Sequence, residues 1–203
     1  MNILAICSAL NNSCLTLSYN DTLYSEIIKS DENYHSLYLI SKIKDLLKKE
    51  NIKKENIDAL CVNCGPGSFT GIRVALTIAK VMAGELNLPL IPLNTAEILL
   101  TQYNCDILLM DARRDMYFVA TKENIELIYK DKIEDKIKNK TLLCDKRCSE
   151  IFTNSICFED ENKNLGTIMI KLAEEKYNNE ADKTMFDFQN VQANYIQTPP
   201  IFG

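Results

Sequence analysis

The order of apolar and polar residues predicts three short strands at the start of the chain. Apolar runs at 3–6, 14–19 and 23–28 are separated by Asn-Asn-Ser and Asn-Asp, which favour turns. Short strands joined by tight connections are typical of an antiparallel meander, so the sequence predicts a three-stranded antiparallel unit here.

The pattern then changes to alternating helices and strands. Helical spacing predicts helices at 34–50, from the glycine-rich loop to about residue 86, and at 95–103, with apolar strands at 57–63 and 88–92 between them. Three antiparallel strands followed by alternating helices and strands is the order of a ribonuclease-H-like half-domain.

The second half begins in the same way and is shorter. A second meander is predicted at 107–111, 117–121 and 126–129, and a lysine-rich polar segment follows it. The remaining elements are a strand at 141–145 and helices at 148–152 and 165–177. The repetition predicts an α/β protein of two ribonuclease-H-like lobes, residues 1–104 and a shortened lobe at 105–203. The segment after residue 190 reads as too irregular to belong to the core.

Composition fits a globular protein with a substantial core. Of the 203 residues, 46% are apolar and 25% are charged, and no apolar run approaches the ~20 residues needed to span a bilayer. We read "MNILAICSAL" as a first strand and not as a signal peptide, so we expect a cytoplasmic protein without membrane contact. The net charge of −5 argues against strong direct binding of a nucleic-acid backbone.

The eight cysteines are expected to be unpaired thiols beside strands. Cys61 and Cys64 have a spacing that suggests zinc or redox chemistry, but the chain has one histidine and no second CxxC. We therefore expect no metal site.

The loop "GPGSFTG" and its following arginine are the first candidate site. It lacks the lysine of a Walker loop and the spacing of a Rossmann fingerprint. A generic anion site at a helix N-terminus remains, formed by Gly65, Gly67, Ser68 and Arg73. The alternative is a tight strand-to-helix turn with Ser68 or Thr70 as N-cap.

Two helices have more apolar surface than one core requires. In the helix after the loop, the polar strip is narrow and consists of Arg73, Thr77, Lys80 and Gly84. The first helix has a core-type face of Leu39, Ile40, Ile43, Leu46 and Leu47, with Tyr34, Leu37 and Tyr38 roughly opposite. Either these strips are buried within the chain, or they form a helix-mediated contact with a partner.

The residues needed for common catalytic sites are largely missing. His35 is the only histidine, and neither a nucleophile elbow nor an H-E-x-x-H motif is present. Actin-like ATPases need a carboxylate after the first strand, where this chain has Cys7, and a thiol is a poor magnesium ligand. The charged cluster "MDARRD" is either a binding site for an anion or a partner's carboxylates, or a solvated turn.

Four segments together resemble the bacterial TsaB (YeaZ) family. They are "GPGSFTGIRVALTIAKVMAGELNLPLIPLNTAEILL", "ILAICSAL", "YHSLYLISKIKDLL" and "LLMDARRDMYFVA", in the family's order. The resemblance covers the first ~120 residues and implies a two-lobed fold of the actin, heat-shock and acetate-kinase type. It implies a non-catalytic subunit for threonylcarbamoyladenosine formation beside the tRNA anticodon.

The resemblance also implies partners and their contacts. The catalytic subunit would be a TsaD-type protein, joined by a TsaE-type ATPase, with tRNA bound indirectly. The partner-binding residues would be Tyr34, His35, Leu37, Tyr38, Ser41, Ile72, Ala75, Leu76, Ala79, Met82 and Ala83. The chain would have no cofactor of its own, although ADP or ATP at the partner interface could be supported by Gly65, Gly67, Ser68 and Arg73. The free chain could pair with itself through the same surface.

The sequence departs from the family pattern at two places. Family members usually have Asp-Thr-Ser where this chain has Cys7, Ser8 and Ala9, and the usual Pro-Tyr-Leu-Arg ending is absent. A stand-alone ATPase or phosphotransferase on the same fold is the alternative, and Cys7 argues against it. A peptidase is a weaker alternative, because neither metal ligands nor a triad can be assembled.

Overall fold

The chain folds into two compact units. The structure is a computed structural model, and it describes residues 1–28, 35–160 and 163–194. The first unit comprises Met1–Thr95 and Asn164–Asn194, and the described part of the second is residues 96–160 and Lys163.

A five-stranded mixed sheet forms the centre of the first unit. Its order is β3-β2-β1-β4-β5, with antiparallel pairing from β1 to β3 and parallel pairing from β1 through β4 to β5. The strands are β1 (Ile3–Cys7), β2 (Ser13–Tyr19), β3 (Thr22–Ile28), β4 (Ala59–Asn63) and β5 (Leu90–Leu93). All residues of β1 and β4 are buried, as expected for central strands covered on both faces.

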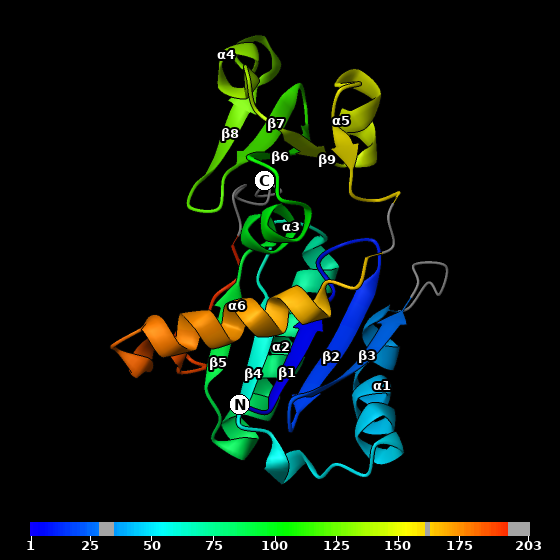
Figure 1. Cartoon of the computed structure of the whole chain (residues 1–203), viewed down its shortest axis with the longest axis vertical. Helices are drawn as coiled ribbons and strands as arrows, with labels where there is room; N and C mark the ends of the chain where they lie inside the picture. The colour runs from blue at the N-terminus through cyan, green and yellow to red at the C-terminus, as the bar shows by residue number, and fades with distance from the viewer. Residues whose placement is uncertain (29–34, 161–162, 195–203) are drawn as a thin grey trace, which may run out of the picture. The chain divides into compact units, whose positions relative to one another are not determined.

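Three helices cover this sheet. Helices α1 (His35–Lys49) and α2 (Phe69–Leu86) lie on one face, and α6 (Gly166–Asn179) crosses the other (Figure 1). The main core lies beneath α1 and α2, where apolar side chains from alternate strand positions meet those of both helices. A one-turn helix, η1 (Lys54–Asn56), precedes β4.

Helix α6 belongs to the first unit, which differs from the predicted division at residue 104. Its buried side chains include Met169, Ile170 and Ala173, and the helix packs on β1, β2 and β5. Gly166 begins this helix so close to β2 that an added Cβ would lie 1.7 Å from the Thr16 hydroxyl oxygen. The predicted boundary followed sequence order, whereas the apolar face of α6 returns the chain to the first sheet.

The segment after α6 also returns to the first unit. It passes through η3 (Lys183–Phe186), and Val191 is buried in the main core. The Asn194 amide donates to the Cys64 carbonyl oxygen at 2.8 Å. The prediction that this segment lies outside the core is therefore wrong at Val191, because one apolar anchor and a backbone bond are enough to hold an irregular chain.

The second unit repeats the topology of the first. Its sheet has the order β10-β9-β6-β7-β8, with antiparallel pairing from β6 to β8 and parallel pairing from β6 through β9 to β10. The strands are β6 (Ile107–Arg113), β7 (Met116–Ala120), β8 (Ile125–Tyr129), β9 (Leu142–Cys144) and β10 (Ile156–Cys157). The predicted duplicated ribonuclease-H-like fold is confirmed.

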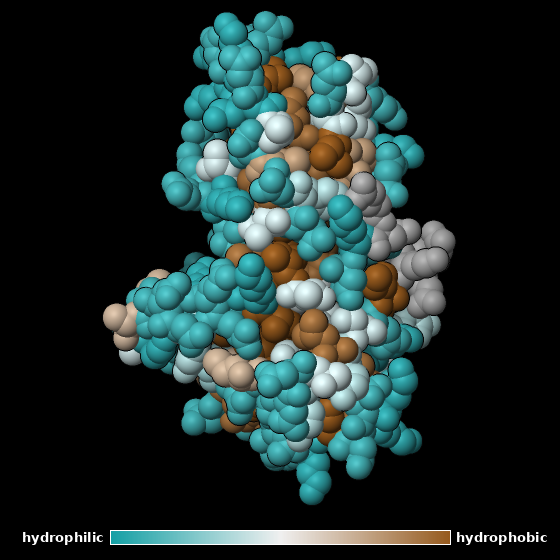
Figure 2. Space-filling model, viewed as in Figure 1, coloured by the Kyte–Doolittle hydropathy of each residue, from teal (hydrophilic) through white to brown (hydrophobic). Residues whose placement is uncertain are grey.

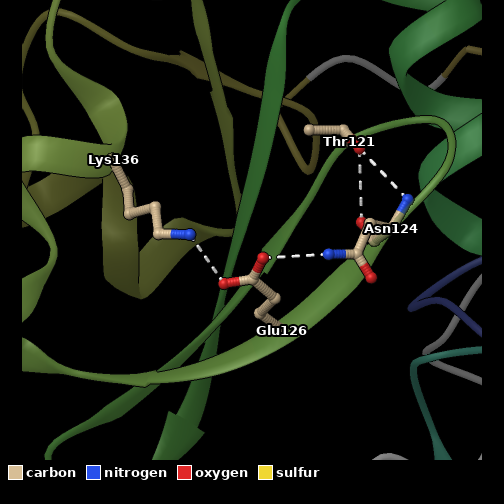
Figure 3. Close-up of polar contacts among 4 residues, drawn as sticks. All are labelled: Thr121, Asn124, Glu126 and Lys136. Atoms are coloured by element: carbon tan, nitrogen blue, oxygen red, sulfur yellow. Dashed lines mark hydrogen bonds and ion pairs between the residues drawn. The ribbon is translucent and has the colours of Figure 1, made fainter.

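Short helices complete the second unit. They are α3 (Thr95–Tyr103), η2 (Lys130–Lys132), α4 (Glu134–Ile137) and α5 (Lys146–Ile151). In Figure 3, Glu126 of β8 accepts from Asn124 in the preceding turn and pairs with Lys136 of α4, both at 2.9 Å. The turn is closed by Thr121, whose amide donates to the Asn124 carbonyl oxygen at 2.8 Å. This network attaches α4, which is too short to show helical periodicity in the sequence.

The cysteines are free thiols, as expected. Seven of the eight are buried, and Cys157 is half-buried. In the described ranges, no three His, Cys, Asp or Glu side chains are grouped so that they could hold a metal ion. Of the helices in those ranges, none has the length and apolar content of a bilayer-crossing segment.

Asp145 should be one of the most important polar residues of the second unit. Its carboxylate caps α5 by accepting from the Cys148 amide at 2.8 Å, and it also accepts from the Asp111 amide at 2.7 Å. Asp145→Ala should lower the free energy of unfolding by about 2 kcal/mol in urea denaturation, because it removes a cap and orphans a second amide. Asp145→Asn keeps the capping oxygen and should cost less; equal losses for the two variants would contradict this role.

Candidate functional site

The glycine loop is packed tightly against the end of β1. An added Cβ at Gly67 would lie 2.1 Å from the Ala9 carbonyl oxygen, and one at Gly71 would lie 1.7 Å from that of Ser8. Gly67 also has φ +155° and Gly65 has φ +98°, which side-chain-bearing residues rarely adopt. Close backbone approach therefore explains Gly67 and Gly71, and the positive φ explains Gly65, without a ligand.

A buried asparagine connects the loop to three neighbouring segments. Asn63 Oδ1 accepts from the Gly65 amide at 2.8 Å, and its Nδ2 donates to Cys7 Sγ at 3.5 Å. The Thr95 hydroxyl lies 3.1 Å from Asn63 Oδ1 and 2.5 Å from the Pro66 carbonyl oxygen, and its single proton can serve one of them at a time. Asn63 thus joins the ends of β1 and β4, the loop and Thr95, all within the first unit.

Two amides at the start of α2, those of Ser68 and Gly71, have acceptors within the chain. Ser68 is the N-cap, its Oγ accepting from the Gly71 amide at 3.2 Å, and its own amide donates to the Ala9 carbonyl oxygen at 2.7 Å. These contacts are those of the predicted strand-to-helix turn, with Ser68 and not Thr70 as the cap.

Arg73 lies at the outer side of the same helix end. Its guanidinium carbon is 5.1 Å from the centre of the Phe69 ring, a cation–π contact, and both residues are exposed. The structure therefore brings Gly65, Gly67, Ser68 and Arg73 together around the first turn of α2. Support of a nucleotide by them stays a prediction.

Four of the predicted partner-binding residues are inside the first unit. Ile72, Ala75, Ala79 and Ala83 are buried on the side of α2 that faces the sheet. Their assignment to a partner surface is wrong, because the small residues at i, i+4 and i+8 allow α2 to approach its own core. Leu76 and Met82 are only half-buried and pack at the margin of that core.

The first helix agrees with the prediction in part. Leu39, Ile43 and Leu46 are buried as expected, but Ile40 is 50% exposed. Tyr38 is 45% exposed, and the exposed Ser41 hydroxyl donates to the Tyr38 carbonyl oxygen at 2.8 Å. Tyr34 lies outside the described residues, and for His35 and Leu37 only the backbone in α1 is described.

Large apolar side chains remain at the surface of both helices. On α2, Val81 is 66% exposed and Phe69 is 47% exposed, and on the neighbouring helix α1 Tyr38 and Ile40 are also exposed. We call these four residues, with the half-buried Leu76 and Met82, the α1–α2 surface. By contrast, polar and charged residues dominate the outer side of α6, as Figure 2 shows.

Sequence reasoning missed Ile40, Phe69 and Val81 as surface residues. The sequence pattern predicts Ile40 in the core face of α1. The buried side of that helix is instead centred on Leu39, Ile43 and Leu46, which leaves Ile40 at its edge. Val81 and Phe69 border the polar strip of α2 on either side, at 100° per residue. The signal that pointed to them was the width of the apolar arc, about twice what one core requires.

The charged cluster of the second unit is built around Asp111. Its Oδ2 pairs with Arg147 Nη1 at 2.8 Å, and its Oδ1 accepts from the Arg113 amide at 2.9 Å. Burial acts to raise the pKa of Asp111, but the Arg113 amide and Arg147 outweigh it, and the pKa is lowered. Arg113, Arg114 and Asp115 all have φ between 54° and 64°, which forms the tight β6–β7 turn. The cluster thus contains an ion pair between Asp111 of β6 and Arg147 of α5. The sequence did not predict this pair, because the two residues lie far apart along the chain.

Comparison with known proteins gives the family. Residues 22–164, more than half of the chain, match the family model described as TsaD: tRNA N6-adenosine threonylcarbamoyltransferase. The chain belongs to this family.

Its curated relatives include several TsaB proteins, which confirms the resemblance found in the sequence. The tRNA threonylcarbamoyladenosine biosynthesis protein TsaB of Buchnera aphidicola subsp. Baizongia pistaciae is 36% identical over 101 residues, 49% of this chain and 45% of that protein. TsaB of Bacillus subtilis is 30% identical over 99 residues, which are 49% of this chain and 43% of that protein. TsaB of Escherichia coli is 32% identical over 95 residues, which are 47% of this chain and 41% of that protein. The chain thus spans about half the length of the curated relatives it matches.

Solved structures agree on the fold. A Pseudomonas aeruginosa protein described as uncharacterized, with similarity to peptidase YEAZ, superposes with a TM-score of 0.76 over 97% of this chain and 99% of that one, at 14% identity. YeaZ from Pseudomonas aeruginosa superposes with a TM-score of 0.52 over 63% of each chain, at 21% identity.

Two glycines of α2 should respond oppositely to the same substitution. Gly71→Ala would drive a Cβ into the Ser8 backbone and should lower the free energy of unfolding by about 3 kcal/mol. At Gly84 the nearest atom is the Phe188 ring at 3.1 Å, which has only to shift slightly, and alanine favours a helix by about 1 kcal/mol. Gly84→Ala should therefore be neutral or stabilising in urea denaturation; a tolerated Gly71→Ala would show that the loop is not held against β1.

Proposed function

We propose that this chain is a non-catalytic subunit that binds and activates a TsaD-type threonylcarbamoyltransferase, for threonylcarbamoyladenosine formation next to the tRNA anticodon. Family membership and the TsaB names of its relatives support the pathway. The α1–α2 surface is the observation that supports binding to a partner.

The α1–α2 surface has the character of a helix-docking site. Val81 and Ile40 are aliphatic side chains at least half exposed, and Tyr38 and Phe69 add two aromatic rings. Burying such side chains against the apolar face of another helix is favourable, at roughly 25 cal/mol per Å² of apolar area. Aromatic residues are also enriched at the centres of protein interfaces.

Both helices are held firmly in place before any partner binds. The opposite side of α2 is fixed by Ala75 and Ala79 in the core, and α1 is tied to β3 by Lys42 and Glu26 at 2.7 Å. A surface that is already ordered loses little conformational entropy on association, which favours affinity. A partner would therefore meet a preformed surface.

The environment of Cys7 favours a binding role over the alternative of a stand-alone ATPase or phosphotransferase. The Cys7 side chain is fully buried and accepts a hydrogen bond from Asn63. Such chemistry on this fold needs a carboxylate after the first strand to hold a metal and water, and a thiol is a poor magnesium ligand.

The proposed partners follow the family resemblance. The TsaD-type subunit would bind the α1–α2 surface, a TsaE-type ATPase would join the pair, and tRNA would be held through the complex in the cytoplasm. Ser68 and Arg73 stand at the end of α2 beside Phe69, so an ADP or ATP at this interface would have a helix N-terminus and a cation nearby.

Reconstitution tests the proposed function. The cognate TsaD-type and TsaE-type proteins, supplied with threonylcarbamoyl-adenylate, ATP and tRNA, should form threonylcarbamoyladenosine only when this chain is added, as measured by nucleoside mass spectrometry. Equal product without the chain would contradict the proposal. ATP turnover by the pure chain would instead favour the phosphotransferase alternative.

Val81→Arg should prevent the complex while leaving the fold intact. Val81 is 66% exposed, so an arginine fits in the free chain but would bury an unpaired charge in a helix–helix contact. We expect at least a 100-fold loss of affinity for the TsaD-type subunit in calorimetric titration, with an unchanged melting temperature.

Tyr129→Arg is the matched control for this variant. Tyr129 is also more than half exposed but lies on β8 of the second unit, so its replacement should leave binding unchanged. Unimpaired binding by Val81→Arg, or equal impairment by both variants, would overturn the assignment of the surface. A self-paired free chain would show as a doubled mass in light scattering that Val81→Arg removes.

A further inference from the structure

Two buried cysteines face each other across the first antiparallel strand pair. Cys7 ends β1, and Cys14 is its direct partner in β2. Directly opposite residues in antiparallel strands have Cα atoms about 4.5–5.5 Å apart. Disulfides form at Cα separations of roughly 4.4–6.8 Å, so this register suits a cross-strand bond without strand movement.

The two thiols also contact each other. The Cys14 thiol hydrogen-bonds to Cys7, and this bond, with a second from Asn63, lowers the pKa of Cys7 to about 7 against the effect of burial. The same bond and burial raise the pKa of Cys14 well above its usual range. Both side chains are buried, so the property that favours a bond between the two sulfurs is their contact across the strand pair.

The other thiols of the first unit have different partners. Cys61 donates to the Met169 carbonyl oxygen at 4.0 Å, and Cys64 donates to that of Val62 at 3.8 Å. In the second unit, Cys144 and Cys157 are also neighbours, on the parallel strands β9 and β10, and burial raises the pKa of Cys144 to about 11. Of these two neighbouring pairs, Cys7 and Cys14 are the pair that lies directly opposite in antiparallel strands, the register that suits a cross-strand bond.

We propose that Cys7 and Cys14 are a modification site, which hydrogen peroxide converts into a reversible intrachain disulfide. The Cys7 thiolate attacks one peroxide oxygen, the O–O bond breaks, and the leaving hydroxide takes up a proton to become water. The Cys14 sulfur then attacks the resulting sulfenic sulfur, and its proton leaves with the hydroxyl group as a second water. The two sulfurs lose two electrons, and the two peroxide oxygens gain them.

Asn63 would carry the change to the glycine loop. Its Nδ2 donates to Cys7 Sγ at 3.5 Å, and its Oδ1 accepts from the Gly65 amide at 2.8 Å. A disulfide sulfur is a weaker acceptor than a thiolate, so oxidation would loosen one end of this bridge. The Gly65 amide resonance should therefore move on oxidation and return on reduction.

The test is made on the folded full chain with Cys157→Ser, which removes the neighbouring pair of the second unit. After a few equivalents of hydrogen peroxide, the chain is unfolded, free thiols are alkylated, and peptides are mapped by mass spectrometry. We expect Cys7 and Cys14 to be the first thiols lost, linked to each other and recovered with dithiothreitol. Prior loss of Cys61 or Cys64, or a Cys7 that remains alkylatable, would overturn the proposal.

Cys14→Ser separates a disulfide from simple oxidation of Cys7. Without the second sulfur, Cys7 should stop at the sulfenic acid, which dimedone traps, and no linked peptide should form. Trapping by dimedone to the same extent in the parent chain and in Cys14→Ser would show that Cys14 does not resolve the intermediate. The readout on the parent chain does not depend on this variant folding.

Discussion

The close packing of the glycine loop against the end of β1 is the constraint on which the first unit depends. Gly67 and Gly71 bring the loop within van der Waals contact of the Ala9 and Ser8 carbonyl groups, where no side chain fits. Ser68 then caps α2, and Asn63 fixes the loop to β4. The position and rotation of α2 follow from these contacts, so the loop determines which side chains of the helix enter the core and which remain outside.

That rotation gives α2 two distinct sides. Ala75, Ala79 and Ala83 allow the helix to lie close to the sheet, while Val81 and Phe69 are left at the surface, as are Tyr38 and Ile40 of α1. The opposite face of the sheet carries α6, whose outer side is polar (Figure 2). The exposed apolar side chains of α1 and α2 support the proposed binding role, and the glycine loop contributes by fixing how α2 is placed.

Strand order and the duplicated topology could be predicted because tight turns and apolar runs are local signals. The return of α6 and Val191 to the first unit could not, because it depends on contacts between residues far apart in sequence. For the site, the wide apolar arc predicted that apolar side chains would remain exposed, but it did not identify them. Ala79 is predicted to bind the partner and is buried, whereas Val81 is not among the predicted residues and is exposed. A helical wheel gives the angles between side chains; the rotation of the helix comes from the loop before it.

The proposed function requires α1 and α2 to form a preordered surface for a TsaD-type subunit. Hydrogen–deuterium exchange of the chain, alone and with that subunit, tests it most directly, because it reports on every peptide without substitution. We expect added protection in peptides that cover α1 and α2, with α6 and the second sheet unchanged. Protection confined to α6 or to the second unit, with α1 and α2 unaffected, would contradict it.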